Sequence, residues 1–576
     1  MTKQHPLDFR IWLGTLAIIG ITATAVLPAY AAVSPDDPTA DAALQAPEGD
    51  PLIERIQQRL IEMGLFKGRA TGRVDEALRD SIKVYERLSG RVVTGEPTED
   101  LMDGLEAHGD IQDLLGRLAN SRRKSIEQAR SALADHPATR DLLQGDTEFR
   151  ADPTRDPNIC FDAPTARCLL EEAELAARTV FKPELRDWAL SEVLVAQADA
   201  GMAEAARRTA ARMTDPRLIM SALRDIAVAQ AESGHIDDAL AVTDIIPDAN
   251  RRADGMMAVI DALSRSDEAE SANRIAESLD TLIGTLAAGP KVVDLRARLA
   301  VAMARLKQSS AASKQLDAAE YAAQNDVTAE ERDGAIRSVA GAMADLRMPD
   351  RALALLEQTR NDIGRASVLM SAAAAQAEAG DAAAALSTAD SISEVRYRAV
   401  VLGRIALAQF RQGDADAAQT TLDLALAAVE RIRLPFARSF AISRIALALS
   451  TMAAENPTGA DGYAAAIQTS ERIDDARLRA QTLWTIAQSQ AKHDQDAAKY
   501  AAGLAMKATD DIRSVLSRAW MYADLAEDRA KSGDSEGAWL AFDQGMAATR
   551  SIDNDWSRAR ALARIATTLI ILVDQE

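Results

Sequence analysis

The chain has 576 residues, and its 66 Lys and Arg against 87 Asp and Glu give a formal net charge of −21. This acidic balance disfavours a protein that neutralises nucleic-acid phosphates, so no nucleic acid is expected among its partners. The 4% aromatic content, together with abundant Ala after residue 160, disfavours an extended β architecture and favours closely packed helices.

The first 31 residues have the layout of a secretory signal peptide. A polar start that includes Arg10 precedes an uncharged, mostly apolar run, and small residues stand at Ala29 and Ala31. We predict cleavage after Ala31 and export to the periplasm or cell envelope of a bacterium. The alternative is an uncleaved anchor, because no charge falls between Arg10 and Asp36. Only in that case is the membrane expected as a partner.

A linker and a small helical unit follow. Residues 32–50 are rich in Pro, Asp and Ala and lack apolar periodicity, which predicts a disordered linker. Residues 51–107 are predicted to form three short helices around a common core. The residues on the core faces of these helices are Ile53, Ile56 and Leu60, then Leu78, Ile82 and Tyr85, then Leu101 and Leu105.

The glycines and polar residues of this unit stand in a characteristic order. The series is Ile56-Gln57, Leu60, Gly64-Leu65-Phe66, Gly68, Thr71-Gly72, Tyr85-Glu86, Gly90, Thr94-Gly95, Thr98 and Leu101. It resembles the peptidoglycan-binding-like domain, a three-helix module of bacterial cell-wall proteins. Where that family usually has Asp-Gly, Phe-Gln and a Gly before the second helix, this chain has Thr71-Gly72, Tyr85-Glu86 and Asp75.

The resemblance implies peptidoglycan as a ligand. Cationic side chains beside an aromatic ring suit the carboxylates and sugar faces of wall peptides and glycans. We therefore expect the wall contacts to be Phe66, Lys67, Arg69, Arg73 and Tyr85. The alternative is a solvated basic loop without a ligand.

Residues 108–159 are predicted to form a helical connector that ends in a second linker. Cys160 and Cys168 follow, and two lone thiols in an exported chain are expected to pair. A straight helix would hold them about 12 Å apart, but Pro164 lies between them and lets Cys160 fold back. A metal site is disfavoured, because no His lies nearby.

From residue 160 to 576 the chain repeats. Gly201 and Gly234 end related pentapeptides 33 residues apart, and Gly380 and Gly413 repeat this period. Each unit has an apolar-Ala pair, a turn Gly and an Ala five residues later, as at Gly533. This scheme predicts helical hairpins, with Gly in a left-handed turn and Ala where the two helices approach.

The Gly-x4-Ala scheme resembles the tetratricopeptide repeat family in degenerate form, since the Trp and Tyr positions of that family mostly hold small or aliphatic residues. We therefore predict an all-α chain: a small three-helix domain and a long α-solenoid, a tetratricopeptide-like superhelix that docks one or more unidentified protein partners. Residues 264–326 follow the scheme least well and are expected to be a distorted unit or a bend.

An Arg also recurs six residues after an Ile. The pairs are Ile392 and Arg398, Ile473 and Arg479, Ile512 and Arg518, and Ile552 and Arg558. Such arginines would form a ladder along the solenoid. We expect them to pair with carboxylates of neighbouring units rather than to bind a ligand.

No constellation for catalysis, metal binding or cofactor binding is expected. His108, His136, His235 and His493 are scattered without metal-ligand spacing. Ser121-x2-Lys124, Ser271-x-Asn273 and Lys531-Ser-Gly533 follow the order of penicillin-binding enzyme motifs, but their positions do not suit one pocket. The sequence thus predicts a non-enzymatic envelope scaffold. The alternatives are a pure protein-interaction scaffold and a regulator or enzyme of wall turnover.

Overall fold

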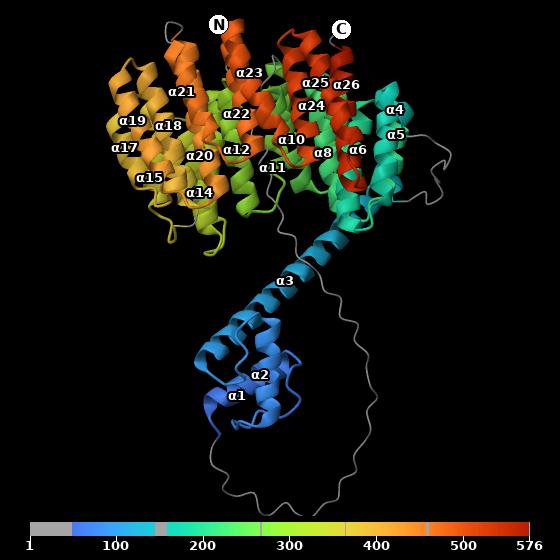
Figure 1. Ribbon diagram of the computed structural model, residues 1–576, viewed down its shortest axis with the longest axis vertical. Coiled ribbons are helices and arrows are strands. Elements are labelled where there is room, and N and C mark those ends of the chain that lie inside the picture. The colour runs from blue at the N-terminus through green and yellow to red at the C-terminus, as the bar shows by residue number, and fades with distance from the viewer. Residues whose placement is uncertain (1–48, 144–157, 265–267, 363, 457–459, 575–576) are drawn as a thin grey trace, which may run out of the picture. The chain divides into compact units, whose positions relative to one another are not determined.

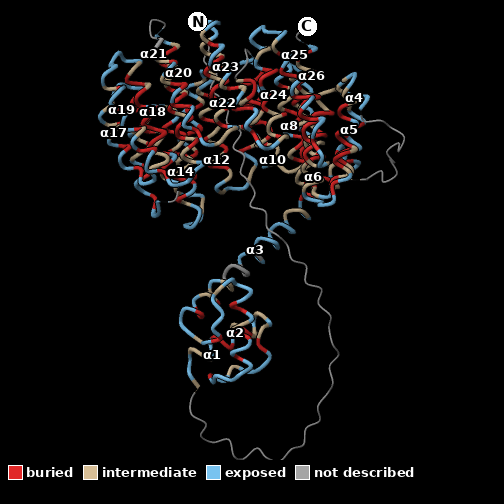
Figure 2. Tube along the Cα trace, in the orientation of Figure 1, coloured by how far each residue is buried: buried red, intermediate tan, exposed pale blue. Residues whose placement is uncertain are grey.

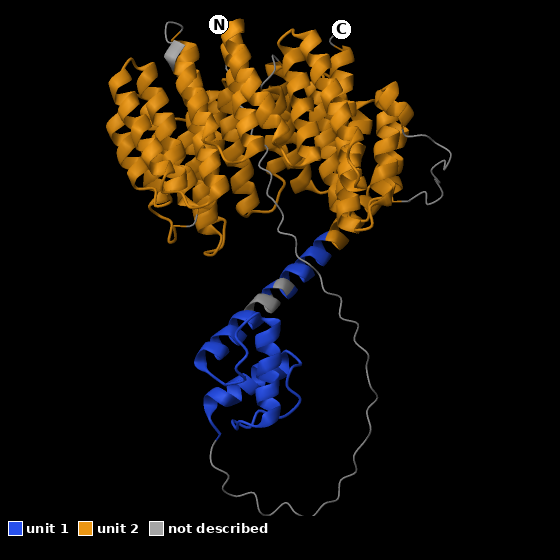
Figure 3. Cartoon of the chain, viewed as in Figure 1, with its two compact units in different colours: residues 1–125 blue, residues 126–576 orange. Residues whose placement is uncertain are grey.

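The computed structural model describes residues 49–143, 158–264, 268–362, 364–456 and 460–574 (Figure 1). The predicted signal peptide lies outside these residues, as does most of the two predicted linkers. Throughout the described ranges all regular elements are helices, which confirms the all-α prediction. None of these helices is long and apolar enough to span a membrane. The chain divides into two compact units, residues 1–125 and 126–576 (Figure 3).

Unit 1 is a small helical domain. It contains α1 (Pro51–Glu62), α2 (Glu76–Leu88) and the first part of α3 (Glu99–Asp135). Asp50 caps α1 and Asp75 caps α2, each by accepting a backbone N–H of the first turn. The core consists of Ile56, Leu60, Phe66, Leu78, Ile82, Tyr85, Leu101, Met102 and Leu105.

One boundary differs from the prediction. The sequence predicts a last short helix that ends by residue 107 and a separate helical connector from residue 108, whereas α3 runs through both without a break and has 37 residues. Gly109 lies inside this helix. A single Gly inside a helix costs only about 1 kcal/mol relative to Ala, so it does not have to end one.

Unit 2 consists of helical hairpins, preceded by the 3₁₀ turn η1 (Arg140–Leu143) and α4 (Asn158–Asp162). The even-numbered helices are α6 (Pro183–Asp199), α8 (Pro216–Glu232), α10 (Ala249–Leu263), α12 (Pro290–Arg305), α14 (Arg332–Asp345), α16 (Arg365–Glu378), α18 (Val395–Arg411), α20 (Pro435–Glu455), α22 (Ala476–Ala491), α24 (Val515–Lys531) and α26 (Asp555–Asp574). The odd-numbered helices are α5 (Ala166–Thr179), α7 (Ala203–Ala211), α9 (Ile236–Asp244), α11 (Ala269–Ile283), α13 (Ser309–Asn325), α15 (Pro349–Leu356), α17 (Ala382–Asp390), α19 (Ala415–Val429), α21 (Ala460–Glu471), α23 (Gln495–Asp510) and α25 (Ser535–Arg550).

These hairpins form a closed ring. Each even-numbered helix packs against the next, from α6 through to α26, and α26 packs in turn against α6 (Figure 1). The odd-numbered helices pack mainly on even-numbered neighbours. Helices that pack against one another all round the ring lie on its smaller circumference. The eleven even-numbered helices from α6 to α26 are therefore the inner wall, and the odd-numbered helices from α5 to α25 are the outer wall.

The last hairpin of the ring joins the two ends of the array. Among the described helices, α5 packs along α26 as its outer helix. Their shared core includes Leu169 and Leu170 of α5 and Leu562, Leu569 and Leu572 of α26. The prediction of an α-solenoid is confirmed, but the sequence did not predict that the solenoid closes.

The hairpin turns share one geometry. Gly201, Gly234, Gly380, Gly413 and Gly533 all have positive φ. The next residue donates its N–H to the carbonyl five residues back, as in Met202 N to Gln197 O at 2.8 Å. This is the Schellman arrangement, in which a residue without Cβ avoids the left-handed penalty.

The region that followed the repeat scheme least well contains a regular hairpin of this kind. Lys307 takes the place of the turn glycine with φ 63°, and Gln308 N donates to Met303 O at 2.8 Å. Helices α12 and α13 therefore form a hairpin like the others, and the sequence signal was weak because Gly is absent from the turn.

Small residues let the helices of each hairpin approach. The Ala five residues after the turn Gly is buried in each unit that follows the scheme, as Ala239, Ala418 and Ala538 illustrate. Buried segments recur along the packed helices of unit 2 (Figure 2). At the closing hairpin, Cys160 of α4 and Cys168 of α5 are disulfide-bonded with Cα atoms 5.5 Å apart. The bond ties α4 to the helix that completes the ring.

Candidate functional site

The loop between α1 and α2 is held by one side chain. Gln57 Oε1 accepts the backbone N–H groups of Thr71 and Gly72 at 2.7 and 2.9 Å, and its Nε2 donates to Arg73 O at 2.9 Å. Gly72 has φ +67°, and a Cβ there would lie 2.5 Å from the Cα of Gly49. The end of the loop is thus fixed in position by the buried Gln57.

Glu86 does the same for the loop between α2 and α3. Its carboxylate accepts Thr94 N at 2.7 Å, Thr94 Oγ1 at 2.6 Å and Gly95 N at 2.9 Å. Burial alone would raise the pKa of Glu86, but the three hydrogen bonds and the nearby Arg91 outweigh it, and the pKa lies below its ordinary value. The two Thr-Gly pairs and their acceptors are therefore one structural device used twice. The sequence contained both pairs, but their shared role was missed.

Two of the predicted wall contacts lie in the core of unit 1. Phe66 is 7% exposed and Tyr85 is 3% exposed, and both belong to the main hydrophobic cluster. Gly68 packs over the Phe66 ring, where a Cβ would come within 2.9 Å of Cε1. These aromatics stabilise the domain, and their burial does not fit the expectation that they stack on sugars.

The three predicted cationic residues, unlike the two buried aromatics, lie at the surface of unit 1. Lys67, Arg69 and Arg73 are exposed, and within the described chain none of them makes an ion pair or a side-chain hydrogen bond. They lie on the loop whose end Gln57 fixes. The structure therefore leaves an uncompensated cationic surface as the candidate ligand site of unit 1.

The inner wall of the ring is the candidate site of unit 2. Eleven helices at an interaxial distance of about 9 Å make a circle of about 16 Å radius, and removing a helix radius of about 5 Å leaves an opening about 20 Å wide. Ion pairs tie neighbouring inner helices together, including Arg411 with Glu455 at 2.7 Å and Arg564 with Asp524 at 2.7 Å.

The ring closes around one arginine. Arg560 of α26 is 1% exposed, and its Nε and Nη2 each donate to Glu192 of α6 at 2.8 Å. Its guanidinium lies 4.5 to 4.7 Å from the ring centroids of Trp188, Trp520 and Trp556. Sequence reasoning missed this cluster, because its members are contributed by helices more than 300 residues apart in the chain.

Three of the four recurrent arginines, Arg398, Arg479 and Arg558, have structural partners, whereas Arg518 makes no ion pair or side-chain hydrogen bond with the described residues. Arg479 donates to Ile473 O at 2.8 Å and Arg558 to Ile552 O at 3.1 Å, in each case six residues back, just past the end of an outer helix. Arg479 also pairs with Asp511 at 3.0 Å, and Arg398 pairs with Asp390 at 3.9 Å. A cation at the carboxyl end of a helix compensates the unpaired carbonyls there.

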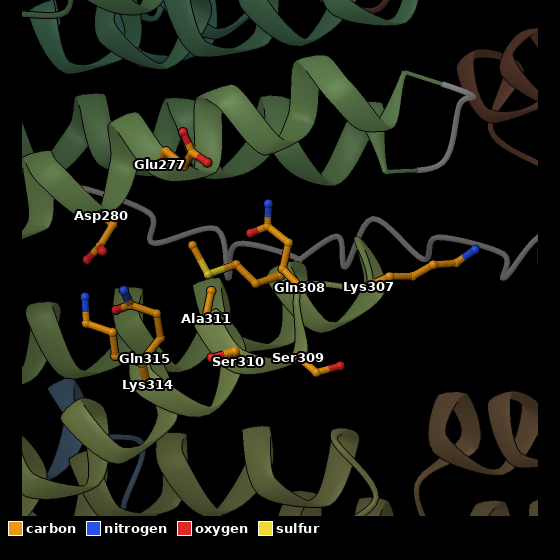
Figure 4. A pocket seen from close by; sticks show the side chains of 10 residues that line it. Glu277, Asp280, Lys307, Gln308, Ser309, Ser310, Ala311, Lys314 and Gln315 are labelled. Carbon is orange, nitrogen blue, oxygen red and sulfur yellow. The ribbon is translucent and has the colours of Figure 1, made fainter.

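A shallow hollow lies beside the α12–α13 turn (Figure 4). Glu277 and Asp280 of α11 line one side, and Gln308, Lys314 and Gln315 line the other. Its lining carries charges of both signs, so it does not suggest a specific ligand.

The motifs that resembled penicillin-binding enzymes are not assembled into one site in unit 2. Ser271 and Asn273 lie on outer helix α11, and Lys531 ends inner helix α24, with other hairpins between them in the ring. Across the described ranges, no group of three or more His, Cys, Asp or Glu side chains could hold a metal ion.

Comparisons with known proteins agree with the unit 1 assignment. A family model described as "Putative peptidoglycan binding domain" matches residues 49–105. No curated protein matches the chain. Among solved structures the chain is similar to a "Circular tandem repeat protein with novel repeat topology and enhanced subunit contact surfaces", with 15% identity, coverage of 71% of this chain and 98% of that chain, and a TM-score of 0.16.

Proposed function

We propose, from the match of residues 49–105 to the peptidoglycan-binding family, that this protein is a non-enzymatic scaffold of the bacterial cell envelope. Unit 1 attaches to peptidoglycan and the ring of unit 2 docks protein partners. The observation that supports the proposal most is the set of unpaired cations Lys67, Arg69 and Arg73 on a fixed loop of the matched domain.

The burial of the aromatics narrows the chemistry of the wall contact. Phe66 and Tyr85 are buried in the core, so the exposed cationic side chains of the loop are the groups that would contact the wall. Guanidinium and ammonium groups bind carboxylates through charge-assisted hydrogen bonds. The expected ligand group is therefore a carboxylate of the wall peptides. Such binding weakens as salt rises, because exposed charges are screened.

Two binding units in one chain give the scaffold its mechanism. Attachment of unit 1 to the wall would raise the local concentration of the ring for partners at the wall. The N-terminal signal sequence predicted for this chain would deliver it to that compartment. The competing proposal is a pure protein-interaction scaffold, which the family departures at Thr71, Asp75 and Glu86 favour.

Co-sedimentation with purified sacculi tests the wall contact. The chain from residue 32 onward is pelleted with sacculi at low and high salt, beside a variant with Lys67, Arg69 and Arg73 changed to Gln. The matched control carries Arg79→Gln and Lys83→Gln, which remove cations paired with acidic side chains in the same unit. We expect the wild type and the control to pellet at low salt and the triple variant to stay in solution. If the wild type does not pellet, the pure scaffold is favoured. If muropeptides are released, the non-enzymatic proposal fails.

A further inference from the structure

One position repeats around the inner wall of the ring. On each inner helix two consecutive apolar residues are buried near the middle, such as Ile405-Ala406 on α18. We call the residue immediately before this pair the belt position. In each of the eleven inner helices it is partly or fully exposed and is followed by two buried residues. The belt positions are Glu192, Asp225, Ala258, Arg298, Ser338, Ser371, Arg404, Arg444, Thr485, Asp524 and Arg564.

The belt positions line the opening of the ring. Outer helices and neighbouring inner helices cover the other faces of an inner helix. On α18 the accessible residues near the middle recur as Tyr397, Arg404, Leu407 and Arg411, which is the spacing of one helix face. The remaining accessible face of each inner helix therefore points to the inside of the ring.

Most charged belt positions have a partner of opposite charge. Arg298 lies 3.2 Å from Asp254, and Arg564 lies 2.7 Å from Asp524. Glu192 is held by Arg560. Charge on the inner wall is thus compensated within the ring at these places.

Arg404 and Arg444 are different. They occupy the belt positions of the adjacent helices α18 and α20, and throughout the described residues neither makes an ion pair or a side-chain hydrogen bond. The belt positions on either side, Ser371 and Thr485, are uncharged.

The two helices approach closely at this level. A Cβ on Gly403 would lie 3.4 Å from Ile445 Cγ1, so the residue before Arg404 faces the residue after Arg444. Burial lowers the pKa of Arg444, and the charge of Arg404 lowers it further. Further along the same face of α18, the ion pair of Arg411 with Glu455 lies two turns, or about 10 Å, from Arg404.

The partly buried charge of Arg444 beside the like charge of Arg404 carries an electrostatic cost that an anion would relieve. Guanidinium groups recognise carboxylate and phosphate oxygens through paired hydrogen bonds. Leu407 and Leu447 stand one turn further along and would exclude water from such a contact.

We propose that Arg404 and Arg444 form a binding site on the inner wall for an oxyanion, the carboxylate or phosphate group of a ligand that enters the ring. This proposal does not depend on wall binding by unit 1, so the two can fail separately.

Calorimetric titration with inorganic phosphate and with citrate tests the site, at constant ionic strength on the chain from residue 32 onward. We expect at least one of the two anions to bind, and Arg404→Gln or Arg444→Gln to weaken that binding at least tenfold. Arg411→Gln, on the same helix and in an existing ion pair, should change it less than twofold. Binding of phosphate alone identifies a phosphoryl group, and binding of citrate alone identifies a carboxylate.

Thermal unfolding without either anion is a second readout. Arg444→Gln should leave the melting temperature unchanged or raise it, because it removes a like-charge contact, whereas Arg564→Gln should lower it. The proposal is overturned if neither anion binds the wild type, if the variants bind as tightly as the wild type, or if Arg444→Gln lowers the melting temperature as Arg564→Gln does.

Discussion

Replacing Arg560 by Met tests how the ring is held closed. Met keeps much of the volume between the three Trp rings but removes the charge. The loss includes the buried ion pair with Glu192 and three cation–π contacts. Breaking a buried pair costs about 3 to 5 kcal/mol. Because the Glu192 side chain keeps 32% exposure and regains water, we expect a loss near the lower end, about 3 kcal/mol in the free energy of unfolding.

Urea unfolding followed by Trp fluorescence measures this loss directly, since three of the six Trp residues surround Arg560. Arg298→Met is the matched control. Arg298 also pairs across inner helices, with Asp254, but its side chain is 40% exposed. An exposed pair of this kind contributes about 1 kcal/mol or less. Restoring neutrality in the double variant Arg560→Met with Glu192→Met should recover part of the loss, because no buried charge is then left without a partner.

Hydrogen exchange separates closure from a local defect. If Arg560 holds the ends of the ring together, Arg560→Met should raise amide exchange in α5, α6 and α26 well above that in α14 and α16, which lie across the ring. The reasoning is refuted if Arg560→Met costs no more than Arg298→Met, or if exchange rises equally in all hairpins.

Three further outcomes follow from the same contacts. Leu170→Ala, at a fully buried position between α5 and α26, should lower the unfolding free energy by about 2 to 5 kcal/mol in urea. Changing Cys160 and Cys168 to Ser should cost about 2 to 3 kcal/mol, seen as a melting temperature that dithiothreitol no longer alters. Because the folded pKa of Glu86 is lowered from 4.5, its contribution is present above the unfolded pKa and is lost as pH falls through the folded value. Glu86→Gln should therefore flatten the acid limb of unit 1 melting between pH 5 and pH 3, followed by circular dichroism; an unchanged acid limb contradicts this assignment.

The local structure of the repeats could be predicted because it is set by local chemistry. A turn glycine and an alanine five residues later fix the hairpin, as at Gly413 and Ala418, and both lie where the sequence placed them. Closure could not be predicted, because the path of a solenoid depends on a small rotation per repeat that accumulates over many hairpins. Helix α5 also lacks the turn glycine that marked α7, α9, α17, α19 and α25, since its partner α26 is far from it in the sequence.

Some residues of the candidate sites could also be predicted from the sequence, and others could not. The sequence was enough to predict that the cationic side chains of the unit 1 loop are exposed, because a loop that joins two short helices lies at the surface. The aromatics could not be assigned, since Phe66 and Tyr85 suit both a core and a sugar contact and only packing decides between them. Arg404 and Arg444 could not be paired in advance, because their adjacency depends on the register of two helices separated by α19.

Closure also limits how the ring can take a partner. An open solenoid adapts its curvature to a ligand, whereas a ring with a fixed number of hairpins keeps an opening of about 20 Å. A partner wider than that must bind outside or separate α26 from α5 and α6, where segments far apart in the sequence meet. The Arg560 cluster joins α26 to α6 across this contact, whereas the disulfide joins α4 to α5 on one side of it. The Arg560 cluster therefore resists opening there, which favours ligands that enter the ring without opening it.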